Sequence, residues 1–378
     1  MPNFSVRELN QLPLLSDFIR MASSLRLELS TLTTDDRPVF VTGNFCDWLP
    51  DLEQFRMQPT GTGQYVYEFP DAFGLPTTLE YKYTRGGWDH VELDASGEGV
   101  ANRTVENTTN VKREHVPHWR WFGMPFNPEL LPKIELLGDT FDVPKLGATR
   151  RVHVLLPYDY EHSGKHYPVL YLHDGQNLFG GGVGYGSWEV DQKMALLAAR
   201  HRHEVILVSI DHAHNERIRE FTFHPTRAGS GRGRYYIDFI QNTLKPLVDK
   251  RLRTLSDPAH TGIGGSSLGG LISIYAGLMH PDVFGRLMVF SPSLWISPKI
   301  YFDAIQFRAP VPMKIYAYGG EQESKYMVPN IQRFNNALVR QNYGGNAIDV
   351  HLSVDPTGTH QEAHWSREFP KAVEWLFY

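Results

Sequence analysis

The sequence has little cysteine and no long apolar run, and each of these absences excludes a class of structural feature. Cys46 is the only cysteine among 378 residues, which excludes a disulfide within the chain and a zinc cluster built on thiolates. No run of about 18 apolar residues occurs, so we expect no membrane-spanning helix. The first residues also lack a basic start followed by an apolar stretch, and these absences together favour a cytoplasmic protein.

A strong excess of charge of one sign is also missing. Lys and Arg number 37 and Asp and Glu number 42, which gives a formal net charge of -5. No basic stripe interleaved with aromatic residues occurs, so we expect no nucleic-acid partner. In contrast, 41% of the residues are hydrophobic and 12% are aromatic, which is enough for sizeable cores and argues against disorder. A chain of this length favours two domains.

The spacing of apolar residues changes once along the chain. From Leu25 to about Val111, apolar and polar residues alternate in short segments such as SLRLELST and GQYVYEFP, which predicts a small antiparallel, immunoglobulin-like all-β sandwich. Later segments are short apolar runs without alternation, separated by helical stretches, which predicts an α/β fold with a doubly wound, mostly parallel sheet. The predicted parts are an N-terminal segment 1–24, a sandwich domain 25–115, a Trp- and Pro-rich connector 116–133 and an α/β domain 134–378.

A glycine-rich stretch at residues 261–270 reads TGIGGSSLGG. It lacks the lysine of a phosphate-binding loop and the third glycine of a dinucleotide fingerprint. It matches the G-x-S-x-G pattern, in which Gly265 and Gly269 flank Ser267 and allow a strained turn between a strand and a helix. The neighbouring Ser266 has a glycine at only one of the two required offsets. The pattern therefore predicts Ser267 as a nucleophile at the N-terminus of a helix, where negative charge is stabilised.

A nucleophilic serine needs a histidine base and an acid that orients this base. In an α/β hydrolase the acid and then the histidine follow the serine along the chain. The loop YGGEQES offers Glu321 and Glu323, and the loop DPTGTHQEAHW offers His360 and His364. We predict His360 as the base, because it follows Gly358 in a loop, whereas His364 falls in the first turn of the last helix. Glu323 is the preferred acid, and Glu321 is interpreted as a solvated loop carboxylate.

Two backbone amides are predicted to bind the oxyanion that forms during acyl transfer. One is the N–H of Leu268, directly after the nucleophile. The other is the N–H of Gln176, in the loop that follows an early strand, where Gly175 would let the backbone approach the substrate closely. We interpret Asp174 in the same loop as a structural residue.

Two further polar clusters have simpler interpretations. The segment DHAHNE contains Asp211, His212 and His214 and could suggest a metal. Two histidines at such short spacing are more often part of a polar loop, and we expect neither a metal nor another cofactor. Arg217 and Arg219 are possible substrate-binding residues, since guanidinium groups bind anionic groups.

The C-terminal half resembles the esterase D-type α/β hydrolases, which include enterochelin esterases and carbohydrate acyl esterases. The resemblance rests on YPVLYLHDGQNLF, GIGGSSLGGLISIYAGLMHPDVFG, FSPSLW, YGGEQES and GTHQEAHW. In the enterochelin branch a methionine follows the acidic glutamate by a few residues, as Met327 follows Glu323. The family histidine precedes a tryptophan by five positions, as His360 precedes Trp365. The resemblance implies a serine carboxylic-ester hydrolase without a cofactor.

The N-terminal half resembles starch- and glycogen-binding sandwich modules through VFVTGNFCDW, LEYKYTRGGWDHVELD and VANRTV. Those modules often carry a sugar-stacking tryptophan shortly before NR, and SGEGVANR has none. We expect Trp48 in the core and Trp88 exposed in a hairpin, where it could contact a saccharide.

The sequence leaves three functions open. The leading one is an esterase with a Ser-His-Glu triad that acts on a siderophore-like or other small multi-ester molecule. The alternative is an acetyl or feruloyl esterase acting on saccharides. A third is a glucan-binding protein with a vestigial hydrolase half, against which the complete set of candidate catalytic residues argues.

Overall fold

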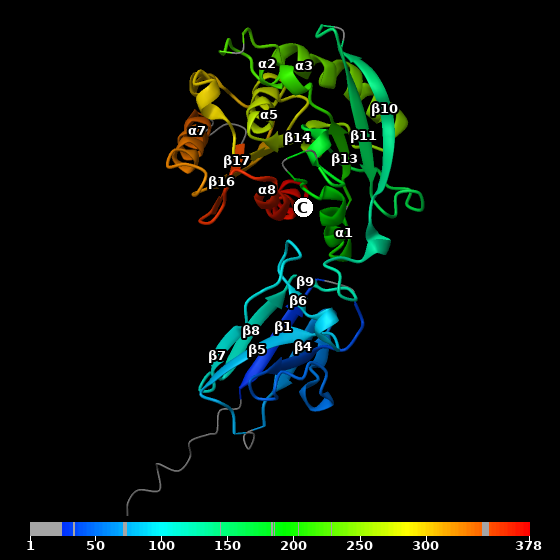
Figure 1. The fold of residues 1–378 in the computed structure, drawn as a ribbon, viewed down its shortest axis with the longest axis vertical. Helices are drawn as coiled ribbons and strands as arrows, with labels where there is room; N and C mark the ends of the chain where they lie inside the picture. The colour runs from blue at the N-terminus through cyan, green and yellow to red at the C-terminus, as the bar shows by residue number, and fades with distance from the viewer. Residues whose placement is uncertain are drawn as a thin grey trace, which may run out of the picture. The chain divides into compact units, whose positions relative to one another are not determined.

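The structure is a computed structural model that describes residues 25–378 apart from 33–34, 71–73, 144, 183, 185, 203, 228 and 342–347. The predicted N-terminal segment 1–24 lies outside the described residues. Two compact units are present (Figure 1). The first contains the described residues up to Glu92 together with Gly99–Trp119, and the second contains Leu93–Glu98 and Arg120–Tyr378.

The first unit consists of short strands in two main sheets, with the orders β3-β4-β1-β8 and β2-β5-β7. Along β1, Leu27, Leu29 and Thr31 are buried and alternate with more exposed residues, as a strand with one face on a core requires. The strands are β1 (Arg26–Thr31), β2 (Phe40–Gly43), β3 (Gln58–Gly61), β4 (Gln64–Glu68), β5 (Thr78–Thr84), β6 (Glu92–Leu93), β7 (Arg103–Glu106), β8 (Val111–Val116) and β9 (His118–Trp119).

The pairing of β1 with β8 differs from the predicted all-antiparallel arrangement. These two strands run parallel, with Arg26 opposite Val111 and Thr31 opposite Val116. Parallel neighbours need a long crossover connection, and here nearly the whole first unit lies between the two strands. The antiparallel prediction is therefore wrong at this edge of the sheet.

The second unit contains one eight-stranded sheet in the order β10-β11-β13-β12-β14-β15-β16-β17. The pairs β10/β11 and β11/β13 are antiparallel, and the pairs from β13 to β17 are parallel. The strands are β10 (Lys133–Val143), β11 (Ala148–Leu156), β12 (Val169–Leu172), β13 (Ile206–Ile210), β14 (Thr261–Ser266), β15 (Arg286–Phe290), β16 (Met313–Gly320) and β17 (Ile348–Asp355). The carboxyl ends of the parallel strands meet at one edge, which is where sites in such sheets usually form.

Helices cover both faces of this sheet (Figure 1). Buried side chains of α1 and α8 share one core cluster, and those of α3 to α7 share the other. The helices are α1 (Val190–Ala199), α2 (Arg217–Glu220), α3 (Gly233–Phe239), α4 (Lys245–Arg251), α5 (Leu268–Met279), α6 (Ile300–Gln306), α7 (Met327–Gln341) and α8 (Glu362–Phe377). The second unit is thus a mixed sheet enclosed by helices.

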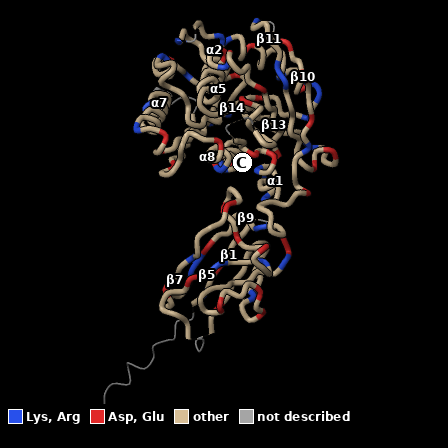
Figure 2. The backbone as a smooth tube through the Cα atoms, viewed as in Figure 1, with Lys and Arg blue, Asp and Glu red and all other residues tan. Residues whose placement is uncertain are grey.

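Acidic and basic residues are distributed along both units in Figure 2 and form no long stretch of one sign. This distribution follows from the nearly balanced composition. Across the residues that the structure describes, none of the helices has the length and apolar character needed to cross a membrane.

Candidate active site

Ser267 lies between β14 and α5 with φ 58° and ψ -118°, a conformation that is strained for a residue with a side chain. A Cβ added to Gly265 would lie 3.2 Å from the Gly269 Cα, and one added to Gly269 would lie 3.1 Å from an oxygen of Asp174. The two glycines therefore let the strand and the helix approach each other closely. Leu268 is the first residue of α5, where backbone N–H groups have no acceptor within the helix.

The candidate acid and base lie in direct contact. His360 Nδ1 is 2.6 Å from Glu323 Oε2. The other carboxylate oxygen, Oε1, accepts hydrogen bonds from the Ser291 hydroxyl at 2.6 Å and from the Gly320 N–H at 2.8 Å. The Glu323 side chain is 1% exposed, whereas that of His360 is 37% exposed. The carboxylate is thus held on both oxygens, and the second nitrogen of the imidazole stays available for proton transfer.

Two loops at the carboxyl ends of neighbouring strands bring this pair together. After β16 and β17 the loops are joined by backbone hydrogen bonds, from Glu321 N to Asp355 O at 2.9 Å and from Gln322 N to Gly358 O at 3.0 Å. A Cβ on Gly320 would lie 2.2 Å from the Gly358 carbonyl oxygen, so only glycine allows this approach. The contact between the two loops sets the distance between the acid and the histidine.

The alternative acid, Glu321, and the alternative base, His364, lie outside the contact between Glu323 and His360. Glu321 is exposed to solvent, as the sequence interpretation expects. His364 lies in the first turn of α8, where its Nδ1 is 3.3 Å from Asp355 Oδ2. The ring of His360, in contrast, packs edge-on against Trp365 at 5.0 Å between ring centroids.

The nucleophile candidate is held by a different loop. Ser267 Oγ is 3.1 Å from Ser293 Oγ, and no hydrogen bond joins Ser267 to His360 in the described part of the chain. The structure therefore pairs Glu323 with His360 and places Ser267 beside Ser293. Ser291 and Ser293 are not among the site residues predicted from the sequence, although both lie in the motif FSPSLW.

The turn that contains Gln176 is fixed by reciprocal hydrogen bonds. The Gln176 side chain donates to the His212 carbonyl at 3.0 Å and accepts from the His212 N–H at 2.9 Å. A Cβ on Gly175 would lie 2.6 Å from both Asp211 Oδ1 and Ser209 Oγ. The small size of Gly175 therefore leaves room for these two side chains, and the role of the Gln176 N–H in binding an oxyanion stays a prediction.

The arginines considered for substrate binding are already paired with carboxylates. Arg217 binds both oxygens of Asp174, at 2.6 and 2.7 Å. Burial opposes the charge of Arg217, but the attraction and hydrogen bonds of Asp174 raise the pKa of this guanidinium above its usual value. Arg219 donates to Glu216 at 3.0 Å. The ion pair with Arg217 agrees with the interpretation of Asp174 as a structural residue, which stays a prediction.

A buried histidine packs against the glycines of the nucleophile turn. An added Cβ on Gly265 or on Gly269 would lie 3.3 or 3.4 Å from the His173 Cβ. His173 is 1% exposed, and its Nδ1 is 2.9 Å from the Tyr236 hydroxyl. Burial lowers the pKa of His173 to about 4, so the ring is neutral at pH 7.

In the first unit, Trp88 is 41% exposed, as expected. Trp48 is only half-buried and lies 6.5 Å from Trp88 between ring centroids, so the expectation that it belongs to the core is wrong. The physical reason is the turn after β2, which places Trp48 at a φ of 58° and buries Cys46. The two tryptophans therefore form a partly exposed aromatic pair.

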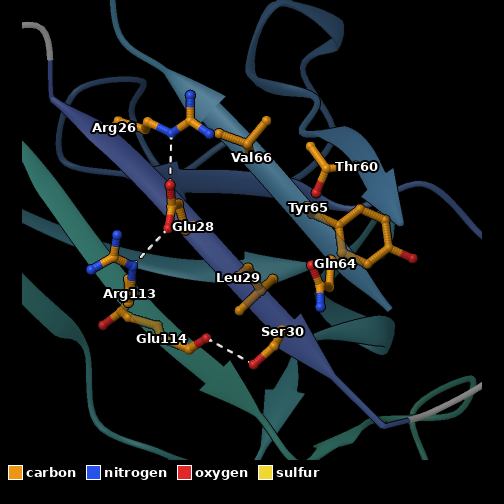
Figure 3. Close-up of a pocket in the computed structure, with 10 residues that line it drawn as sticks. All are labelled: Arg26, Glu28, Leu29, Ser30, Thr60, Gln64, Tyr65, Val66, Arg113 and Glu114. Atoms are coloured by element: carbon orange, nitrogen blue, oxygen red, sulfur yellow. Dashed lines mark hydrogen bonds and ion pairs between the residues drawn. The ribbon is translucent and has the colours of Figure 1, made fainter. Parts of the chain in front are cut away.

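Two of the hollows among the described residues are lined in part by polar side chains. One, of about 310 Å³, lies on β1, β4 and β8 of the first unit, and Figure 3 shows that Glu28 bridges Arg26 and Arg113 there. The other, of about 600 Å³, lies in the second unit and is lined in part by Gln176 and His212. Among the residues that the structure describes, no group of three or more His, Cys, Asp or Glu side chains is placed to hold a metal ion.

Residues 144–376 match the model of the Esterase family. The chain belongs to this family. It is a carboxylic ester hydrolase, and its second unit has the α/β-hydrolase type of fold. YbbA, an uncharacterized protein of Bacillus subtilis, is 24% identical to this esterase over 60% of this chain and 92% of its own length.

A siderophore triacetylfusarinine C esterase of Aspergillus fumigatus is 29% identical over 34% of this esterase. The match spans 44% of that relative's length, which is less than half. The crystal structure of the enterobactin esterase FES from Shigella flexneri, determined in the presence of enterobactin, has a TM-score of 0.52 to this esterase. It is 18% identical, and the match covers 91% of both chains. This similarity shows that the two proteins share a fold.

Proposed function

We propose that this esterase cleaves its substrate with a triad of Ser267, His360 and Glu323. The observation that carries the proposal is the 2.6 Å contact between His360 Nδ1 and the buried carboxylate of Glu323. A histidine held in this way is oriented as a general base, with its Nε2 available for the proton of a serine. The strained turn of Ser267 at the start of α5 supports its role as the nucleophile.

In the proposed reaction, Ser267 Oγ attacks the ester carbonyl carbon while His360 takes the hydroxyl proton. The N–H groups of Leu268 and Gln176 stabilise the negative oxygen of the tetrahedral intermediate. His360 then gives the proton to the leaving alcohol, and an acyl group remains on Ser267. Water hydrolyses this acyl-enzyme with the same histidine as base.

We propose a siderophore-like or other small multi-ester molecule as the substrate. The similarity to a named siderophore esterase supports this choice. The second candidate is an acylated saccharide, which the aromatic pair of Trp48 and Trp88 favours because tryptophan rings stack on sugars. In both cases we propose residues 25–115 as a carbohydrate-binding-like sandwich that aids substrate binding and residues 134–378 as the catalytic domain. Membership of the Esterase family argues against a vestigial hydrolase half.

Two experiments test the proposal. A fluorophosphonate probe should label Ser267, and Ser267→Ala should abolish both labelling and turnover, since loss of a triad nucleophile costs many orders of magnitude in rate. Ser266→Ala is the matched control, because Ser266 is the adjacent buried serine and should leave labelling intact. Persistent turnover in the Ser267 variant would contradict the mechanism. A screen of aryl esters, catecholate trilactones and acetylated or feruloylated saccharides would then distinguish the substrates.

A further inference from the structure

The loop after β15 is joined to the nucleophile turn on both sides of Ser267. The Ser267 N–H donates to the Phe290 carbonyl at 2.9 Å, and the Ser293 N–H donates to the Ser267 carbonyl at 3.0 Å. A Cβ on Gly270 would lie 3.0 Å from the Phe290 carbonyl oxygen, so the loop can approach α5 only because this position is glycine. These contacts fix the position of Ser293 relative to the nucleophile.

The hydroxyl of Ser293 points at the reacting atom. Ser293 is 2% exposed, and its Oγ lies 3.1 Å from Ser267 Oγ. Among the described residues, this is the one hydrogen bond that the Ser293 hydroxyl makes. A buried hydroxyl without a partner is destabilising, and here the partner is the nucleophile itself.

The chemistry of the triad sets the direction of this hydrogen bond. His360 Nδ1 is occupied by Glu323, so the proton of Ser267 has to pass to the other ring nitrogen of His360. Because the Ser267 proton is directed to His360, Ser267 Oγ can only accept a hydrogen bond from the Ser293 hydroxyl. A donor at this position stabilises negative charge on Ser267 Oγ, and such charge develops when the C–O bond of the acyl-enzyme breaks.

We propose that Ser293 is a further catalytic residue, which donates a hydrogen bond to Ser267 Oγ as the bond between that oxygen and the acyl carbon breaks. This inference rests on the proposed triad. In this step water forms a bond to the acyl carbon and gives a proton to His360. The bond from that carbon to Ser267 Oγ then breaks, its electron pair stays on Oγ, and Oγ takes the proton back from His360. Ser293 keeps its own proton throughout.

The test is the steady-state kinetics of Ser293→Ala on an activated aryl ester. With such a substrate, kcat reports deacylation and kcat/KM reports acylation. We expect kcat and KM to fall together by about tenfold, the value of one hydrogen bond to a charged group, with kcat/KM changed by less than about threefold. Ser293→Thr keeps the hydroxyl and should restore kcat.

Ser297→Ala is the matched control, because Ser297 is 3% exposed, lies on the same loop and directs its hydroxyl to Tyr275 at 2.9 Å. It should leave both kinetic parameters near the wild-type values. An unchanged kcat in Ser293→Ala, or a kcat/KM that falls as much as kcat, overturns the inference. If wild-type protein fails to hydrolyse esters through Ser267, the triad itself is refuted and this role of Ser293 with it.

Discussion

The buried carboxylate of Glu323 makes Glu323→Gln the most informative substitution in this esterase. The native side chain accepts hydrogen bonds from Ser291 and Gly320 at one oxygen and contacts His360 with the other. The Gly320 N–H can only donate, so the glutamine carbonyl oxygen has to take the place of Oε1. The amide nitrogen of the variant then faces His360 Nδ1 and donates a hydrogen bond to it.

This reversal changes the tautomer of His360. Its proton moves to Nε2, the nitrogen that should accept the proton of Ser267, and the imidazole also loses the carboxylate that stabilises its charged form. A substitution of this kind in a Ser-His-Asp triad lowers kcat by about 10⁴-fold, and we expect a loss of this order here. The fold should persist, because glutamine has the same size and keeps both hydrogen bonds at Oε1.

The assay is kcat/KM for an aryl ester, with thermal unfolding measured in parallel. Glu321→Gln is the matched control, since Glu321 is an exposed carboxylate two residues away and should be silent. If Glu323→Gln stays folded and keeps activity within about tenfold of wild type, the reasoning about the triad is refuted. A loss in Glu321→Gln instead would assign the acid to that residue.

Two other properties can be tested. Burial lowers the pKa of His173 to about 4 from 6.5, so between these values the unfolded chain binds a proton that the folded protein does not. The free energy of unfolding should therefore decrease as the pH is lowered through this window, by up to about 1.4 kcal/mol per pH unit. Urea unfolding of His173→Gln should lack this contribution. Equal pH dependence of the free energy of unfolding in the variant and the wild type would contradict this reasoning. Trp88→Ala should spare the turnover of a small aryl ester and lower kcat/KM for a bulky substrate, because remote contacts position the reacting ester. Equal kcat/KM losses on both substrates would leave Trp88 without a role in binding.

The sequence by itself determined those features that depend on residues close together in the chain. Gly265 and Gly269 around Ser267 specify a strained turn between a strand and a helix, because only residues without a Cβ allow the close approach that such a turn needs. The helical stretches predicted between the later apolar runs are likewise present, with α5 and α7 among them. The strand β10 gave no such signal, since most of its residues are exposed or only partly buried.

The tertiary structure decided which distant groups became partners. Arg217 and Asp174 form an ion pair across the second unit, so a cation that looks available in the sequence is already neutralised. Ser293 reaches Ser267 only because β14 and β15 are neighbours in the sheet. The parallel pairing of β1 with β8 also depends on strands far apart in the chain. Such contacts arise when elements pack side by side, and no local pattern of residues specifies which elements those will be.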